Sequence, residues 1–197
     1  APSLAHRYVI KCTTLVRLAT SWCVRGALLC ALALLGPLAQ AGEVNVAVAG
    51  NFSTPMQKIA AEFEKATGHH AVLAFGAVGK FYSQIQAGAP FEVLVSADQA
   101  TPEKLEQADL AIASSRYTYA VGRLVLWSPK PGLVDDQGAV LAQGRFEHLA
   151  IANPKIAVYG AAAVEVLTRL GLLEQVQPKF VTGETINQAF QFVSSGN

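Results

Sequence analysis

The sequence predicts an α/β fold with mostly parallel sheets, and two observations support this. Segments typical of strands and of helices alternate along the chain from residue 43 onward, which is the order that parallel strands with crossover helices require. A loop-like stretch at 129–144, rich in proline and glycine, divides the strands into two sets. We therefore expect two lobes, residues 42–122 and 123–197, with residues 117–128 as the strand that crosses between them.

The first elements of this pattern are a strand at 43–50 and a helix after it. Valines at positions 44, 46 and 48 alternate with small or polar residues, as in a strand with two different faces. Ser53 or Thr54 can cap the helix, Pro55 suits its first turn, and Gly68 ends it. Helical spacing predicts one apolar face on it, made of Met56, Ile59, Ala60 and Phe63.

The alternation continues to the end of the chain. Residues 71–75 and 91–97 are apolar strand candidates, and a helix at about 79–87 separates them. Asp98 and Pro102 mark the start of another helix, and residues 117–128 are long, apolar and rich in β-formers. Beyond the loop we expect a strand at 149–153, a helix at 160–170 that Gly171 stops, a strand at 179–183 and a helix at 185–193.

Residues 1–41 have the organisation of a secretory signal peptide. Positive charges that include Lys11, Arg17 and Arg25 precede or begin an apolar run at 26–38, and Ala39 and Ala41 form a cleavage site. The run is shorter than the ~20 residues of a spanning helix, so a membrane anchor is the weaker interpretation. We expect cleavage before Gly42 and export to a bacterial periplasm. At the other end, residues 190–197 stop just past a helix, and we expect a truncated chain.

Composition excludes several kinds of function. The formal net charge is +1, which gives no reason to expect nucleic acid or an anionic membrane as a partner. All cysteines lie within residues 1–41, so the remainder has no disulfide and no thiolate nucleophile. His69 and His70 are adjacent and far from other ligating residues, and no G-x-S-x-G turn is present. We therefore expect no catalytic residue, no metal ligand and no cofactor.

Four turns that lead into helices are the candidate site. The first N–H groups of a helix lack intrahelical partners and carry about half a positive charge between them. In α/β sheets such turns lie beyond the carboxyl ends of the strands, where ligands bind. If several of them converge, they form a pocket of hydrogen-bond donors for an anion or a polar small molecule. The four turns are Gly50–Ser53, Gly76–Gly79, Tyr159–Ala161 and Glu184–Ile186.

The glycine-rich turn at 76–79 does not have the spacing of a nucleotide site. A P-loop needs four residues between its glycines and a Ser or Thr after the lysine. Here two residues separate Gly76 from Gly79, and Phe81 follows Lys80. A dinucleotide fingerprint would need a third glycine and an acid about twenty residues further on, and Glu92 does not make a convincing version.

Several segments, among them "VNVAVAGNF", "QAGAPFEVLVSAD", "IANPKIAVYG" and "VTGETINQAF", resemble the periplasmic molybdate-binding proteins of bacterial molybdate ABC importers. The resemblance runs in order over nearly all of the chain after residue 43. It implies a type II periplasmic binding protein fold whose two lobes close over one tetrahedral oxyanion, molybdate or tungstate. It further implies a monomeric receptor, not an enzyme, that delivers its ligand to an ABC permease in the inner membrane.

The same resemblance implies which residues bind the oxyanion. In that family backbone N–H groups and a few side chains at helix starts hold the dianion, without a Lys or Arg. The family usually has a serine where Val78 stands and often a proline where Val158 stands, so weaker molybdate binding and a different ligand are both open. The residues that the resemblance assigns to the ligand are Gly50, Asn51, Ala77, Val78, Tyr159 and Ile186.

Three alternatives follow from the residues. The chain could be a receptor for another small oxyanion or polar solute, although an amino-acid receptor would need an Arg that the four turns lack. It could be an exported α/β enzyme acting on an anionic substrate, for which the turns offer only Glu184 as a base. It could also be a fragment without binding activity. Because type II receptors complete their first lobe with their last strands, we expect this chain to be poorly stable alone.

Overall fold

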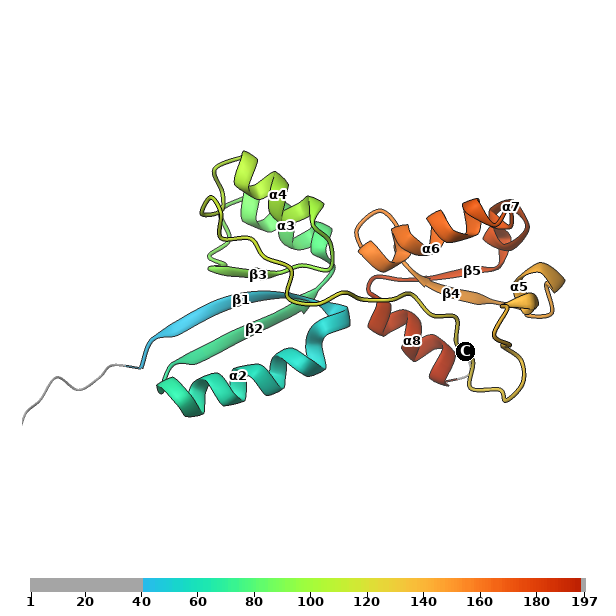
Figure 1. Ribbon diagram of the computed structural model, residues 1–197, viewed down its shortest axis with the longest axis horizontal. Coiled ribbons are helices and arrows are strands. Elements are labelled where there is room, and N and C mark those ends of the chain that lie inside the picture. The colour runs from blue at the N-terminus through green and yellow to red at the C-terminus, as the bar shows by residue number, and fades with distance from the viewer. Residues whose placement is uncertain (1–40, 196–197) are drawn as a thin grey trace, which may run out of the picture. The chain divides into compact units, whose positions relative to one another are not determined.

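The computed structural model describes residues 41–195, shown coloured in Figure 1. The predicted signal peptide lies outside these residues except for Ala41, which is the last residue of its expected cleavage site. None of the helices in the described range is long and apolar enough to cross a membrane.

The first sheet contains β1 (Glu43–Ala49), β2 (His70–Gly76) and β3 (Val93–Val95) in the order β2-β1-β3. Both pairings are parallel, and β1 and β2 run in register from Glu43 opposite His70 to Ala49 opposite Gly76. The central strand β1 is buried from Val46 to Ala49. Its alternating pattern thus predicted a strand correctly, and the parallel pairing brings the carboxyl ends of β1 and β2 together.

Helices cover both faces of this sheet. Figure 1 shows α2 (Ser53–Thr67) on one face and α3 (Val78–Gln86) with α4 (Ala100–Gln107) on the other. A short 3-10 helix, η1 (Gly50–Phe52), joins β1 to α2. On the predicted apolar face of α2, Met56 and Ala60 pack against the core around Val48, whereas Ile59 and Phe63 are exposed.

The second sheet pairs β4 (Leu149–Ala152) with β5 (Phe180–Gly183) in parallel. Figure 1 shows α6 (Val158–Arg169) and α7 (Leu173–Val176) on one face and α8 (Ile186–Ser195) on the other. A 3-10 helix, η2 (Gln177–Lys179), follows α7, and α5 (Ala139–Gln143) lies within the predicted loop. The sequence did not predict α5 and α7, whose Leu141 and Val176 form a buried cluster with Leu167 of α6.

Two predicted helix caps do not lie at the capping positions. Gln99, not Asp98, is at the capping position of α4, although the Asp98 Oδ1 accepts a hydrogen bond from the Thr101 N–H in the first turn of that helix at 3.3 Å. Neither Ser53 nor Thr54 caps α2, which has Phe52 at the capping position and no side-chain cap. The Ser53 hydroxyl instead donates to the Gly50 carbonyl at 2.9 Å, because η1 precedes the helix.

The prediction that residues 117–128 form a strand was wrong. The segment runs from the first sheet to the second, as expected, but no described strand lies beside it. Side chains anchor it instead: the Tyr119 ring packs against Phe52, with ring centroids 4.8 Å apart, and Trp127 packs against Phe190 at 5.0 Å. β-forming residues supply propensity, but a strand also needs a neighbour to accept its backbone hydrogen bonds. The strand β3 is also shorter than the predicted 91–97.

Candidate functional site

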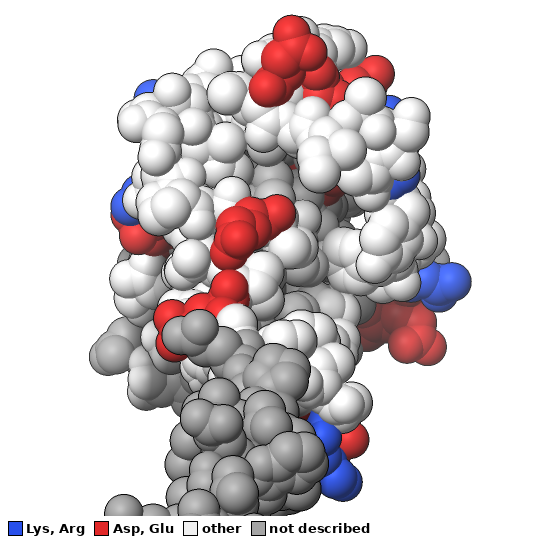
Figure 2. Space-filling view, turned by 90° about the vertical axis from the view of Figure 1, so that its left-hand side faces the viewer, with Lys and Arg blue, Asp and Glu red and all other residues white. Residues whose placement is uncertain are grey.

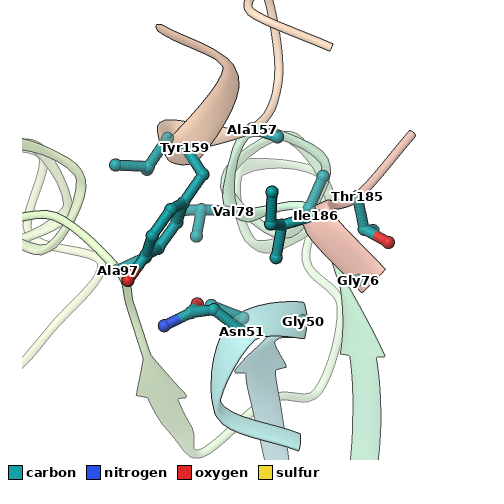
Figure 3. A pocket seen from close by; sticks show the side chains of 12 residues that line it. Gly50, Asn51, Gly76, Val78, Ala97, Ala157, Tyr159, Thr185 and Ile186 are labelled. Carbon is teal, nitrogen blue, oxygen red and sulfur yellow. The ribbon is translucent and has the colours of Figure 1, made fainter. Parts of the chain in front are cut away.

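Helix N-termini from both sheets meet around one pocket (Figure 3). The helix η1 follows β1, α3 follows β2, α6 follows the β4 loop, and α8 follows β5. All six residues predicted to bind a ligand lie on the pocket wall, although this placement does not test their role. The lining residues are Ala49, Gly50, Asn51, Gly76, Ala77, Val78, Ala97, Ala157, Val158, Tyr159, Thr185 and Ile186.

Local hydrogen bonds determine which backbone N–H groups of the lining already have an acceptor and which do not. At α3, the Gly79 N–H donates to the Ile156 carbonyl at 2.9 Å, and the Lys80 and Phe81 N–H groups donate to the Ala77 carbonyl. Because the first N–H groups of a helix have no intrahelical partner, the Val78 N–H stays available. The glycine-rich turn therefore has the Val78 N–H free to donate to a ligand, whereas the Gly79 N–H donates to the turn before α6.

The start of α6 follows the same rule. The Ala157 carbonyl accepts hydrogen bonds from the N–H groups of Gly160 and Ala161, at 3.0 and 3.2 Å. The N–H groups of Val158 and Tyr159 come before these in the helix and are left without an intrahelical acceptor. Both residues line the pocket, so this helix start directs donors toward it.

The lining residues include no Asp, Glu, Lys, Arg or His. Lys80, which directly follows the glycine-rich turn, forms an ion pair with Glu184 and is not among the lining residues. By contrast, Figure 2 shows acidic and basic side chains interspersed with uncharged ones on an outer face of the molecule. The lining itself therefore contributes no charged side chain, and the helix N-termini around it favour negative charge.

The pocket is small. It encloses about 20 Å³, where a single water needs roughly 10–15 Å³ by the same measure. A nucleotide does not fit such a cavity, which agrees with the spacing argument against a P-loop. The geometry suits a compact guest that needs many donors and no positively charged side chain.

Tyr159 and Tyr119 connect the pocket to the crossing segment. The Tyr159 hydroxyl lies against Gly122, where an added Cβ would overlap it. Burial, and next the neighbouring Tyr159, raise the pKa of the Tyr119 hydroxyl above its usual value. Tyr119 therefore stays neutral and donates to the Ser96 carbonyl at 2.8 Å. This bond holds the segment beside Ala97, a pocket residue that the sequence reasoning missed although it is the last residue of a predicted strand.

Other candidate groups have local roles. The His69 Nδ1 accepts a hydrogen bond from the Gly42 N–H at 2.9 Å, and the His70 Nδ1 lies 3.2 Å from Glu64. Asp135 accepts hydrogen bonds from two N–H groups of its own loop. Within residues 41–195 no group of three His, Cys, Asp or Glu side chains is placed to hold a metal ion.

Known proteins match both the sequence and the fold. Residues 44–197 match the family described as bacterial extracellular solute-binding protein. The molybdate-binding protein ModA of Azotobacter vinelandii is 62% identical over 164 residues, which are 83% of this chain and 65% of that protein. The molybdate-binding protein ModA of Rhodobacter capsulatus is 53% identical over 170 residues, which are 85% of this chain and 67% of that protein.

A solved structure gives the same result. The Azotobacter vinelandii periplasmic molybdate-binding protein superposes with a TM-score of 0.75 and 47% sequence identity, over 78% of this chain and 67% of that one. The match confirms the predicted fold class, an α/β type II binding protein fold, for the part of the chain that it covers.

The relatives show which family the chain belongs to and how much of a full-length member it covers. This chain spans 65% of the length of the Azotobacter protein and 67% of the Rhodobacter protein. Both relatives are named as binding proteins, and both carry the name that the sequence segments suggested. The resemblance to the periplasmic molybdate-binding proteins is thereby confirmed. This chain belongs to the bacterial extracellular solute-binding protein family.

Proposed function

We propose that this chain is a periplasmic receptor that binds molybdate, and tungstate equally, and delivers it to an ABC permease. The observation that carries the proposal is the convergence of helix N-termini on a cavity whose lining has no charged side chain. The names of its relatives support molybdate as the ligand. No cofactor is needed, because the anion is cargo that the protein holds and releases.

Backbone amides can hold a dianion without a base. Each helix N-terminus contributes about half a positive charge and directs free N–H groups at the guest. A hydrogen bond to a charged partner contributes about 1.5–3 kcal/mol. The N–H groups of Val78, Tyr159 and Ile186, together with Gly50 and Asn51, are the proposed donors. Gly50, Asn51 and Val78 lie at helix starts that follow strands of the first sheet, and Tyr159 and Ile186 lie at helix starts beside the second sheet.

The donor-only wall favours molybdate over phosphate. Molybdate is a full dianion at neutral pH and needs donors alone, whereas hydrogen phosphate carries a proton that needs an acceptor. Leaving that proton unpaired costs about 1–3 kcal/mol. Sulfate differs mainly in size, so the fit of a closed cavity must reject it. Tungstate is nearly the same size as molybdate and should bind with similar affinity.

The proposal is tested by calorimetric titration of the chain with molybdate, tungstate, sulfate and phosphate. We expect tight binding of the first two anions and at least about tenfold weaker binding of the last two, as the cost of an unpaired proton implies for phosphate. Flat traces with all four anions would exclude the proposed function. Preferential binding of sulfate or phosphate would support the receptor class but not molybdate as its cargo.

Val78→Ser is expected to raise the affinity for molybdate. The change places a hydroxyl beside the Val78 N–H, and a further hydrogen bond to the dianion should raise affinity about ten- to a hundredfold. Val78→Ala is the matched control, because it removes the same methyl groups without adding a donor. Calorimetry on both variants separates the effect of the added hydroxyl from the effect of removing the two methyl groups. If Val78→Ser binds no better than Val78→Ala, the position does not contact the anion.

A receptor for another small oxyanion or polar solute is the second candidate, and Val78 is the observation that favours it. Val78 is 3% exposed and presents only methyl groups to the pocket. An enzyme acting on an anionic substrate has less support. Tyr159 is the one ionisable side chain among the described lining residues, so the wall offers no carboxylate or imidazole as a general base.

A further inference from the structure

Polar contacts join the turns of the first sheet to those of the second around the pocket. The Asn187 side chain at the start of α8 donates from Nδ2 to the Gly50 carbonyl at 2.8 Å and to the Ser53 hydroxyl at 3.0 Å. On α3, Lys80 forms an ion pair with Glu184, which precedes α8. Each contact therefore links a helix start beside β1 or β2 to the helix start that follows β5.

These side chains are adjacent to the pocket without lining it. Asn187 follows the lining residue Ile186, Glu184 precedes the lining residue Thr185, and Lys80 lies on the first turn of α3 after Val78. Neither the ion pair nor the Asn187 amide belongs to the wall that faces a guest. They can therefore change how firmly the wall is held together without changing the donors that the guest meets.

We propose that Lys80, Glu184 and Asn187 form a clamp that sets the rate at which the pocket opens and releases its anion. This inference rests on the proposed receptor function, because it needs a guest whose release can be timed. A guest enclosed by helix starts from both sheets leaves only after these starts separate, and separation breaks the clamp contacts. Differences in affinity among variants of one binding site arise mostly in the dissociation rate.

The contacts of the clamp are not equivalent. The bond between Asn187 and the Gly50 carbonyl is partly buried, whereas the bond to the Ser53 hydroxyl is exposed; both are bonds of a neutral amide, so salt screens them little. The side chains of Lys80 and Glu184 are 49% and 54% exposed, and an exposed ion pair contributes little and loses strength in salt. Asn187 therefore contributes most to holding the helix starts together, and the ion pair adds a smaller contribution that depends on salt.

The test measures the release of labelled molybdate from the chain during a chase with unlabelled molybdate. Asn187→Ala is expected to release the anion about tenfold faster, because two neutral hydrogen bonds each contribute a few-fold. Lys80→Met and Glu184→Gln are expected to speed release about two- to fivefold each at low salt. The double variant should release no faster than the singles, and high salt should remove the difference from the unmodified chain.

The ion pair between Arg169 and Glu165 within α6 provides the matched control. It is exposed and joins no two helix starts, so Arg169→Met and Glu165→Gln should leave the release rate unchanged. The ratio of molybdate to sulfate affinity should also stay constant in the clamp variants, because their side chains do not face the guest. A merely destabilised fold would lower the active fraction of the sample, whereas the clamp predicts a full active fraction with faster release.

The outcomes separate the clamp from the receptor function. If the unmodified chain binds none of the four anions, the receptor function fails and the clamp fails with it. If it binds molybdate but the variants release it at the original rate, the clamp alone is wrong. Should Asn187→Ala not fold by circular dichroism, the ion-pair variants decide, because half-exposed side chains tolerate substitution. Additive effects of Lys80→Met and Glu184→Gln would also overturn the pairing.

Discussion

Gly160→Ala is expected to remove most of the stability of the fold. Gly160 lies in the first turn of α6, buried against the end of β4. An added Cβ would overlap the Ala152 carbonyl oxygen and lie 2.7 Å from the Ala152 carbonyl carbon and 2.8 Å from the Pro154 nitrogen. These are backbone atoms of one packed unit and cannot rotate away. Overpacking of this kind costs about 3 kcal/mol or more, a large part of an ordinary domain's stability.

Urea denaturation followed by circular dichroism measures this loss as a fall in the transition midpoint. Ala161→Ser is the matched control, because it adds one heavy atom to the next residue of the same turn, which is exposed. Its effect on the free energy of unfolding should stay within about 0.5 kcal/mol. An unchanged midpoint for Gly160→Ala would mean that α6 and β4 do not approach each other as described.

Gly79→Ala should weaken binding without weakening the fold. Gly79 also lies in a first helical turn, but an added Cβ there would meet the Ile156 oxygen at 3.0 Å and the Ile156 Cα at 3.1 Å, which belong to the turn before α6. The contact joins two helix starts across the pocket, and its strain can be relieved by holding them apart. Overpacking costs about 1–3 kcal/mol, which corresponds to an affinity loss of roughly ten- to a hundredfold.

In the absence of a ligand, Gly79→Ala should not lower the stability of the protein. Alanine is favoured over glycine inside a helix by about 0.5–1 kcal/mol, so the urea midpoint should stay constant or rise. Calorimetry with molybdate and urea denaturation on the same sample test both halves of this expectation. Gln84→Ala, at an exposed position of α3, is the control and should leave the affinity unchanged. Retained affinity in Gly79→Ala would show that the close contact between Gly79 and Ile156 is unnecessary for ligand binding.

Short-range patterns were sufficient to predict most of the fold and the turns that line the pocket. The alternation in β1 and the left-handed Gly68 that ends α2, with φ 73°, each depend on neighbours in the sequence. The four helix starts were also readable locally, and parallel strands bring such starts to one edge of a sheet. For this reason all six predicted residues lie on one wall, even though no single turn identified a site.

Longer-range contacts were not readable in the same way. Asn187 reaches the Gly50 carbonyl across 137 positions of sequence, and nothing in its neighbourhood distinguishes it from an ordinary surface amide. The acceptor of the Gly79 N–H, the Ile156 carbonyl, lies on a distant turn, so the residues around Gly79 do not reveal this hydrogen bond. The strand predicted at 117–128 failed because strand formation depends on a neighbour, and side-chain propensity carries no information about one.

The extended segment 117–128 also has a consequence for handling the protein in solution. Val121 and Val125 are 87% and 77% exposed, and Arg123 is the only charged side chain of the stretch. Peptide groups that no described strand satisfies, flanked by β-forming side chains with little charge, are the template on which a second polypeptide adds by edge-to-edge pairing. Self-association at high concentration would therefore begin at this stretch, none of whose residues lines the pocket between the helix starts.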